Sequence, residues 1–527
     1  MYRFLLTLVF LREAVATSCD AEPLALPLQD VQVLPDVADS FMKGIPAKIG
    51  TPPQNLVLLP WADSDLNNTW MYAEPFCKDS GIPNDESCKT RRGGIFNEEK
   101  STSFTGARDI VKAGGAPNET FFKGGQYGVR NLVNSANGAI DTFNLEGSAG
   151  LDGFPFGLPT SKWDDTYSTL SPLGLGRNST YLNALRKAGK IGSRVWSIFW
   201  GRMWIKEPLD GSLILGGYDE KKVAGANYTA PLVYGDYDGS DGCWTGMKVT
   251  LTDIQINYLG GTNVSIFPKG TTLQCCIDPA HHLLLEAPTP YVRNFESISG
   301  LKTNYSSSGL HWNALQTGLD KQFLADLTFH LDSGLRIRVP NNQYMIPTVD
   351  IALNSSRTTD TSKRDILITD IEDEPPILGR YFLTAAYLMV NHDAGTFTLW
   401  QANATRERSL VRVFDEETGK KCENTTGVIQ PSASYTGSAS ESSRPDRGSG
   451  SSSGSPSGAV IGGAVVGAVA GAVLIGLGIT YFLIKRKRKS DTYYFYPAHE
   501  ELQRADIYEM DGNSRADDES YMKAGIR

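Results

Sequence analysis

The sequence predicts a mostly β ectodomain of two lobes, one transmembrane α-helix and a disordered tail. Residues 41–410 alternate short β-rich runs with Gly, Pro and Asn turns. At roughly 370 residues this region is too long for one small core, so two lobes are expected. A second observation is the run from Gly458 to Ile484, which holds 27 residues without a charge. Such a run is long enough to cross a hydrocarbon core of about 30 Å.

The chain begins with a predicted signal peptide at residues 1–16. Arg3 precedes a short apolar run, and Ala14-Val15-Ala16 offers a small-residue cleavage site. The apolar run is too short to span a bilayer, so cleavage is favoured over a retained anchor. Residues 17–40 are expected to form a short N-terminal segment ahead of the lobes.

The two lobes are assigned to residues 41–235 and 236–410. Runs such as 254–256 and 335–339 have the composition of strands. One amphipathic helix is predicted around residues 180–188.

A stalk, a membrane span and a tail follow the lobes. Residues 411–457 form the predicted stalk, because most of this segment is rich in Ser and Gly and has too few apolar residues to build a core. The span 458–484 ends at a run of five basic residues, which places the tail 485–527 in the cytoplasm. The chain is therefore expected to be a single-pass, type I protein of the plasma membrane.

Within the span, three glycines recur every four residues, a spacing that lets two helices approach closely. A homodimer through Gly463, Gly467 and Gly471 is therefore kept as an alternative to a monomer.

Several features indicate an oxidising, extracellular compartment. Secreted chains keep disulfides, and this chain has seven cysteines. Cys77 and Cys88 close a short loop and are the expected pair, while the pairing of the others stays open. The net charge of −9 argues against a nucleic-acid partner. Nine predicted glycosylation sites all precede the span, namely Asn67, Asn118, Asn178, Asn227, Asn263, Asn304, Asn354, Asn403 and Asn424.

Five segments occur in an order that is characteristic of one family: residues 49–54, 127–128, 172–176, 211–219 and 376–383. Together they resemble the pepsin-like aspartic peptidases, and the anchor makes this chain similar to the membrane-anchored, fungal-type members. The resemblance implies a bilobal double β-barrel with a cleft between the lobes. It also implies that Tyr127 lies in the flap over that cleft. Arg380 stands where the family has Asp.

The resemblance also places two catalytic loops, each of which carries Asp-Thr-Gly in the family. Two carboxylates there share a proton and a water molecule, so each needs the other nearby. Strand length puts Trp61-Ala62-Asp63 on the first triplet, with an indole in place of the carboxylate. A second alignment puts Asp63-Ser64-Asp65 there and needs two inserted residues. We favour the first alignment.

The second loop reads Asp278-Pro279-Ala280. Asp278 is retained, but Pro279 has neither a hydroxyl nor a backbone N–H. Ala280 adds a Cβ where the family has Gly. Both loops are therefore degenerate, and activity would need an atypical dyad, of Asp63 with Asp278 or, if they converge, of Asp63 with Asp332.

Two other candidates are set aside. Asp332-Ser333-Gly334 has the letters of an active loop but lies within a β pattern, which favours a turn between strands. His281-His282 lacks further ligands at metal-binding spacing, so no metal is expected. No cofactor is expected either.

We therefore expect a cell-surface glycoprotein that binds a peptide, glycan or protein in its interlobe cleft and is a pseudopeptidase. One alternative is an active, membrane-tethered aspartic endopeptidase with an atypical dyad. Another is a sensor or adhesion receptor that signals through its tail.

Overall fold

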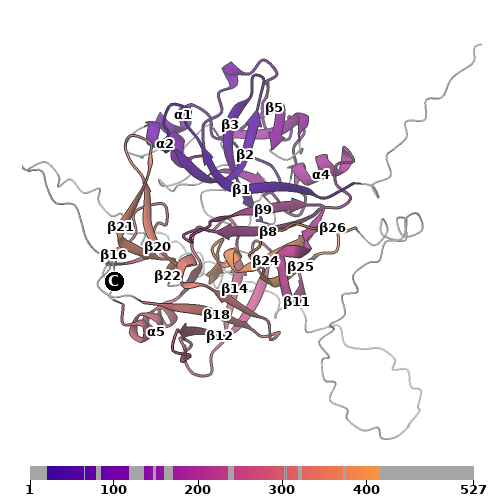
Figure 1. Cartoon of the computed structure of the whole chain (residues 1–527). Helices are drawn as coiled ribbons and strands as arrows, with labels where there is room; N and C mark the ends of the chain where they lie inside the picture. Colours follow the sequence, from indigo (N-terminus) through magenta and orange to yellow (C-terminus); the bar gives the residue numbers. More distant parts are fainter. Residues whose placement is uncertain are drawn as a thin grey trace, which may run out of the picture. The chain divides into compact units, whose positions relative to one another are not determined.

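The computed structural model describes residues 21–63, 66–78, 85–117, 136–145, 150–159, 170–235, 242–301, 303, 305–318, 323–371 and 375–414. The described residues form a mostly β fold with few helices (Figure 1). Two lobes lie on either side of a central sheet to which both halves of the chain contribute strands.

The first lobe is built on β2 and β3, which form a hairpin around the turn at 50–53. Its strands and helices are β2 Phe41–Ile49, β3 Gln54–Trp61, α1 Pro75–Lys78, α2 Asp85–Arg91, η2 Glu98–Lys100, β4 Thr105–Ala107, β5 Ala136–Leu145, β6 Leu151–Pro159 and β7 Ser171–Gly174. The last six residues of β3 are all buried, as expected for a strand covered on both faces.

The central sheet has the order β11-β25-β24-β8-β9-β1 and continues through β1 into β2 of the first lobe. Its strands are β1 Leu24–Gln32, β8 Val195–Arg202, β9 Leu209–Leu215, β11 Val223–Pro231, β24 Ala386–Asn391 and β25 Thr396–Ala402. The first part of β1 pairs with β9 and the second part with β2. Residues 24–32 of the predicted N-terminal segment therefore belong to the fold as β1.

The end of the domain also lies further along the chain than predicted. The strand β10 Gly217–Asp219 pairs with β26 Leu410–Arg412, whose last two residues fall in the predicted stalk. The helix predicted at 180–188 is confirmed as α4 Thr180–Lys187, where Ser179 Oγ accepts the N–H of Leu182 at 3.2 Å and caps the N-terminus. Two short 3-10 turns are also present: η4 Glu220–Lys222 lies between β10 and β11, and η6 Phe382–Thr384 precedes β24.

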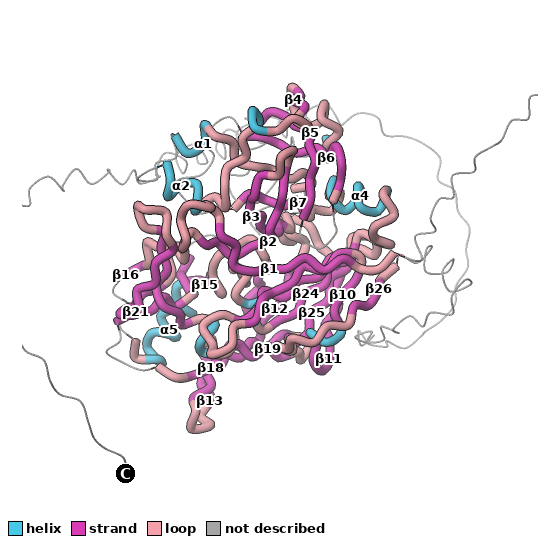
Figure 2. The backbone as a smooth tube through the Cα atoms, turned by 45° about the horizontal axis from the view of Figure 1, so that its top comes forward, coloured by secondary structure: helices cyan, strands magenta, loops and turns pink. Residues whose placement is uncertain are grey.

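The second lobe contains an eight-stranded sheet and a four-stranded sheet (Figure 2). Its elements are β12 Lys248–Tyr258, β13 Asn263–Ser265, β14 Leu273–Ile277, β15 Leu285–Pro288, α5 Thr289–Ser299, β16 Tyr305–Ser306, β17 Leu315–Gly318, β18 Ala325–Leu331, β19 Arg336–Val339, η5 Asn341–Gln343, β20 Met345–Ile351, β21 Arg357–Ile366, β22 Ile368–Ile371 and β23 Ile377–Leu378. Buried and half-buried residues alternate along β18, as in a strand with one face on the core.

The described ranges contain no helix that has both the length and the apolar character needed to span a bilayer. The predicted signal peptide 1–16, span 458–484 and tail 485–527 lie outside those ranges. The same holds for the glycines of the predicted dimer contact and for most of the stalk.

Candidate functional site

The second predicted loop leaves β14 at Asp278. β14 lies parallel to β23, with Ile277 opposite Leu378, and the N–H of Asp278 donates to the Leu378 carbonyl at 2.9 Å. The carboxylate is buried and accepts two hydrogen bonds, from Trp244 Nε1 at 3.2 Å and from the N–H of Ala280 at 2.9 Å. Asp278 is therefore held firmly at the end of this strand.

Burial is the largest influence on the pKa of Asp278, and it raises the pKa above that of an exposed carboxyl. The two hydrogen bonds and the positive charge of Arg380 act in the opposite sense and offset part of this rise. Asp278 is thus a buried carboxyl whose charged form is disfavoured by its surroundings.

The first predicted loop leaves β3 in the same way. β3 lies parallel to β7, with Pro60 opposite Leu173 and Trp61 opposite Gly174. In the second lobe Ile277 lies opposite Leu378, so the next residue after β14, Asp278, is level with Gly379, as Trp61 is with Gly174. Trp61 therefore occupies in the first lobe the strand position that Asp278 occupies in the second.

The two glycines confirm that these strands correspond. A Cβ added to Gly174 would lie 2.2 Å from the Asn68 carbonyl oxygen, and one on Gly379 would lie 2.3 Å from that of Leu283. Both positions admit only Gly because the backbone that follows each loop passes so closely. Asn68 lies seven positions after Trp61, whereas Leu283 lies five after Asp278, so the first loop is two residues longer.

The two extra residues move the first carboxylate along the turn. The carbonyl of Asp63 accepts the N–H of Leu66 at 3.0 Å, just as that of Asp278 accepts the N–H of His281 at 3.1 Å. The strand therefore favours the Trp61-Ala62-Asp63 alignment, whereas the turn places Asp63 in the role of Asp278. Ser64 and Asp65 lie outside the described residues.

The supports of the two loops differ from Asp-Thr-Gly as the sequence indicates. Ala62 is buried and offers no hydroxyl to the facing loop. Pro279 has no N–H to donate, and Ala280 is buried with its Cβ in the turn. Trp61 itself is 1% exposed and packs in the main hydrophobic core.

The predicted disulfide between Cys77 and Cys88 is confirmed. A second disulfide joins Cys243 to Cys276, two residues before Asp278, and fixes Trp244 beside the carboxylate. The sequence left this pairing open, because connectivity among the remaining cysteines cannot be deduced from sequence alone. Cys275 is a buried free thiol, and Cys19 and Cys422 lie outside the described residues.

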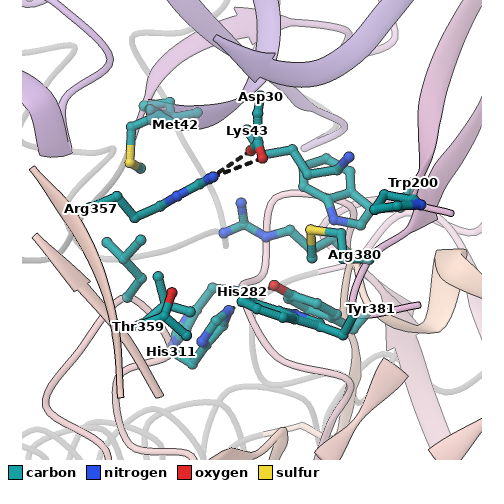
Figure 3. Close-up of a pocket in the computed structure, with 16 residues that line it drawn as sticks. Asp30, Met42, Lys43, Trp200, His282, His311, Arg357, Thr359, Arg380 and Tyr381 are labelled. Carbon is teal, nitrogen blue, oxygen red and sulfur yellow. Dashed lines mark hydrogen bonds and ion pairs between the residues drawn. The ribbon is translucent and has the colours of Figure 1, made fainter. Parts of the chain in front are cut away.

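A pocket of about 300 Å³ lies between the lobes (Figure 3). It is lined by residues of β1, β2, β8, β20 and β21 and of the loops around them: Asp30, Met42, Lys43, Leu170, Trp200, Met203, Trp204, Pro208, His282, Leu310, His311, Val349, Arg357, Thr359, Arg380 and Tyr381. Arg380 belongs to the pocket and also acts on Asp278, so the pocket and the second loop are neighbours. Sequence reasoning noted Arg380 only as a departure from the family pattern.

A row of polar contacts runs from the pocket residue Tyr381 through His311 to Asp365. The Tyr381 hydroxyl lies 2.7 Å from His311 Nε2, and His311 Nδ1 lies 3.6 Å from Asp365. Burial lowers the pKa of His311, so the imidazole is neutral at pH 7. Asp365 is buried and accepts hydrogen bonds from Ser307, Thr348 and Gln316.

The remaining predicted residues do not converge on this site. Asp332 to Gly334 form the exposed turn between β18 and β19, which confirms the prediction of a plain turn. His281 Nε2 lies 3.3 Å from Glu286, and in the part of the chain that the structure describes no three potential ligands are grouped for a metal. Tyr127, the predicted flap residue, lies outside the described residues.

The predicted glycosylation sites fall into three groups. Asn67 is fully buried and its Oδ1 accepts the N–H of Asn178 at 2.8 Å, so a glycan at Asn67 is incompatible with the folded domain. Five are exposed and stay predictions: Asn178, Asn227, Asn263, Asn354 and Asn403. Asn118, Asn304 and Asn424 lie outside the described residues.

Comparison with known proteins agrees with the fold. Residues 166–402 match the family model described as eukaryotic aspartyl protease. The match begins after the first loop and includes β7, the second loop and β23. No curated protein shows significant similarity to the chain.

Proposed function

Because this chain carries a pepsin-like aspartyl protease domain over residues 166–402, we propose that it is a pseudopeptidase that binds a peptide between its lobes. Glycans and folded proteins are the other two ligand classes that the sequence left open. The apolar and basic lining of the interlobe pocket favours a peptide with an acidic group.

One observation carries the proposal: Trp61 stands at the strand position that corresponds to Asp278. Hydrolysis in this fold needs two carboxylates that share one proton and one water. An indole packed in the core can neither hold nor release that proton. In the Trp61-Ala62-Asp63 alignment both loops also lack the hydroxyl and glycine supports, which points the same way.

The test is hydrolysis of denatured protein and of a mixed peptide library by the purified full-length chain between about pH 3 and 6. We expect no cleavage that a transition-state-analogue inhibitor of aspartic peptidases blocks. Inhibitor-sensitive cleavage that disappears in Asp278→Asn would overturn the proposal.

The alternative of an active endopeptidase is favoured by one observation. Asp63 makes the same backbone turn as Asp278. The first loop therefore contains a carboxylate two residues after Trp61. The hydrolysis test decides here too, because an atypical dyad requires that Asp63→Asn and Asp278→Asn abolish cleavage equally.

We also propose that the domain faces the outside of the cell on a single membrane anchor. The two disulfides and the five exposed sequons support an oxidising compartment. Enzymatic deglycosylation of the cell-derived protein is expected to lower its apparent mass, and substitution of Asn67 is expected not to change it. A mass that does not change on deglycosylation would contradict this location.

The sensor alternative makes a different prediction. Deleting residues 490–527 should then abolish a cellular response while display at the surface persists. Binding that needs no tail is what the pseudopeptidase proposal expects.

A further inference from the structure

The interlobe pocket carries more positive than negative charge. Its charged lining consists of Lys43, Arg357, Arg380 and a single carboxylate, Asp30. Arg357 donates two hydrogen bonds to Asp30, at 2.7 and 2.8 Å, so these two charges compensate each other. Lys43 is attracted also by Asp30 and Asp210, and Arg380 by Asp278, but these three carboxylates do not all line the pocket, where Asp30 alone faces the three cations.

Arg380 presents its guanidinium to the pocket. Its Nε donates to the His281 carbonyl at 3.2 Å, which fixes the side chain at its inner end. Figure 3 shows the guanidinium in the middle of the pocket, between the Asp30–Arg357 pair and the group of Tyr381, His282 and His311. Burial lowers the pKa of Arg380 to about 10, so the group remains charged at neutral pH.

Lys43 and Arg380 approach the same indole. The Lys43 ammonium lies 5.8 Å and the Arg380 guanidinium 5.4 Å from the centre of the Trp200 ring. The Lys43 ammonium also donates to the Leu28 carbonyl at 3.2 Å. Both cations therefore border the Trp200 indole, which itself lines the pocket.

The rest of the lining is mostly apolar. Trp204, Leu310 and Val349 provide walls without charge, and the histidines of the pocket are neutral because burial lowers the pKa of each. A fully hydrated inorganic ion would leave these walls in contact with water. A carboxylate attached to an apolar body would satisfy both parts of the lining.

We propose that this pocket is a carboxylate-binding subsite, in which Arg380 and Lys43 receive an acidic residue of a peptide whose apolar neighbours contact the walls. This inference rests on the proposed binding function and names the ligand class of its site. Arg380 is the specificity-determining residue, because it supplies paired N–H donors that match a carboxylate.

The experiment measures binding of 4-phenylbutyrate and of its neutral amide, 4-phenylbutyramide, to the full-length chain by NMR or calorimetry. We expect the acid to bind with a Kd of about millimolar and the amide to bind about tenfold more weakly or not at all. Two peptide libraries, identical except for a fixed central Glu or Gln flanked by Leu, are then compared for retention on the immobilised chain. The Glu library should be retained preferentially.

Three variants test the residues. Arg380→Gln and Lys43→Gln should each weaken 4-phenylbutyrate about tenfold, and Arg380→Lys should retain part of the affinity. Arg336→Gln is the matched control, because it removes the same charge from an exposed position of β19 outside the pocket. Urea unfolding of each variant establishes that it is folded. If Arg380→Gln does not fold, Lys43→Gln provides the binding test.

The outcomes separate this inference from the proposed function. Equal binding of the acid and the amide, or no loss in folded Arg380→Gln and Lys43→Gln, would overturn the subsite. Retention of a sulfated or uronic oligosaccharide in place of the Glu library would also overturn it. Peptide cleavage that depends on Asp278 would instead overturn the pseudopeptidase proposal, whatever the pocket binds.

Discussion

At the residue scale, Trp61 and Asp278 end equivalent strands with unlike side chains. The indole is 1% exposed and packs in the core, whereas the carboxylate is buried against Trp244 and the N–H of Ala280. A large apolar side chain at this point is compatible with the fold but not with shared-proton chemistry. Trp61 therefore has a structural role in the first loop.

Replacing Trp61 with Ala should lower the free energy of unfolding by about 3–5 kcal/mol, because it empties a fully packed site. Trp204, which is 37% exposed, is the control, and Trp204→Ala should cost less than about 1 kcal/mol. Urea unfolding of both variants measures the difference. Equal losses would mean that Trp61 is not part of the core.

Much of the degeneracy could be predicted from the sequence, because it depends on residue types at strand ends. The alignment of the first loop could not be settled from the sequence. Two residues are inserted between Trp61 and Leu66, so the strand aligns Trp61 with Asp278 whereas the turn aligns Asp63 with it. The basic pocket was also missed. Its lining contains Lys43 and Arg380, which are far apart in the sequence, so no local pattern indicates that they share a pocket.

At the element scale, pairing between distant segments decides what local patterns leave open. β1 lies in the segment predicted ahead of the lobes, and its Leu26 and Leu28 are fully buried at alternate positions, as in a strand with one face on the core. β26 has only three residues and forms because β10 offers it an edge. The Cys243–Cys276 disulfide likewise joins two segments that local composition does not relate.

Removing either described disulfide by paired Cys→Ser substitution should lower the free energy of unfolding by about 2–4 kcal/mol. The Cys243–Cys276 link, which spans 33 residues, should cost about 1 kcal/mol more than Cys77–Cys88, which spans 11. Denaturant unfolding of the two double variants provides the comparison. The reverse order would mean that local packing, and not loop closure, sets these contributions.

At the scale of the whole molecule, the histidines make the domain sensitive to acid. All five histidines within the described ranges have pKa values lowered by burial: His281, His282, His311, His330 and His392. The pKa falls to about 3 for His282 and to about 4 for His392. The folded state therefore binds fewer protons than the unfolded state below about pH 6.5.

The free energy of unfolding should accordingly fall as the pH drops from 7 to 4.5, since a depressed folded pKa contributes stability that is lost on acidification. Asp278 and Glu296 act in the opposite sense, because their pKa values are raised, whereas the lowered pKa values of Asp30, Asp360 and Asp365 add to the loss of stability on acidification. Urea unfolding across this range is the measurement. In His282→Asn the slope should decrease by up to about 1.4 kcal/mol per pH unit, and a slope unchanged from that of the parent would contradict the assignment.

The central claim is that Asp63 and Asp278 do not act as a coupled pair, and the titration of Asp278 tests it most directly. The side-chain carboxyl of Asp278 is followed by carbon-13 NMR in the parent chain and in Asp63→Asn. We predict a pKa raised by burial in both proteins and a difference between them of less than about one unit, because coupled carboxyls interact by more than that. A fall of the Asp278 pKa by more than about one unit in Asp63→Asn would show a shared proton and contradict the account.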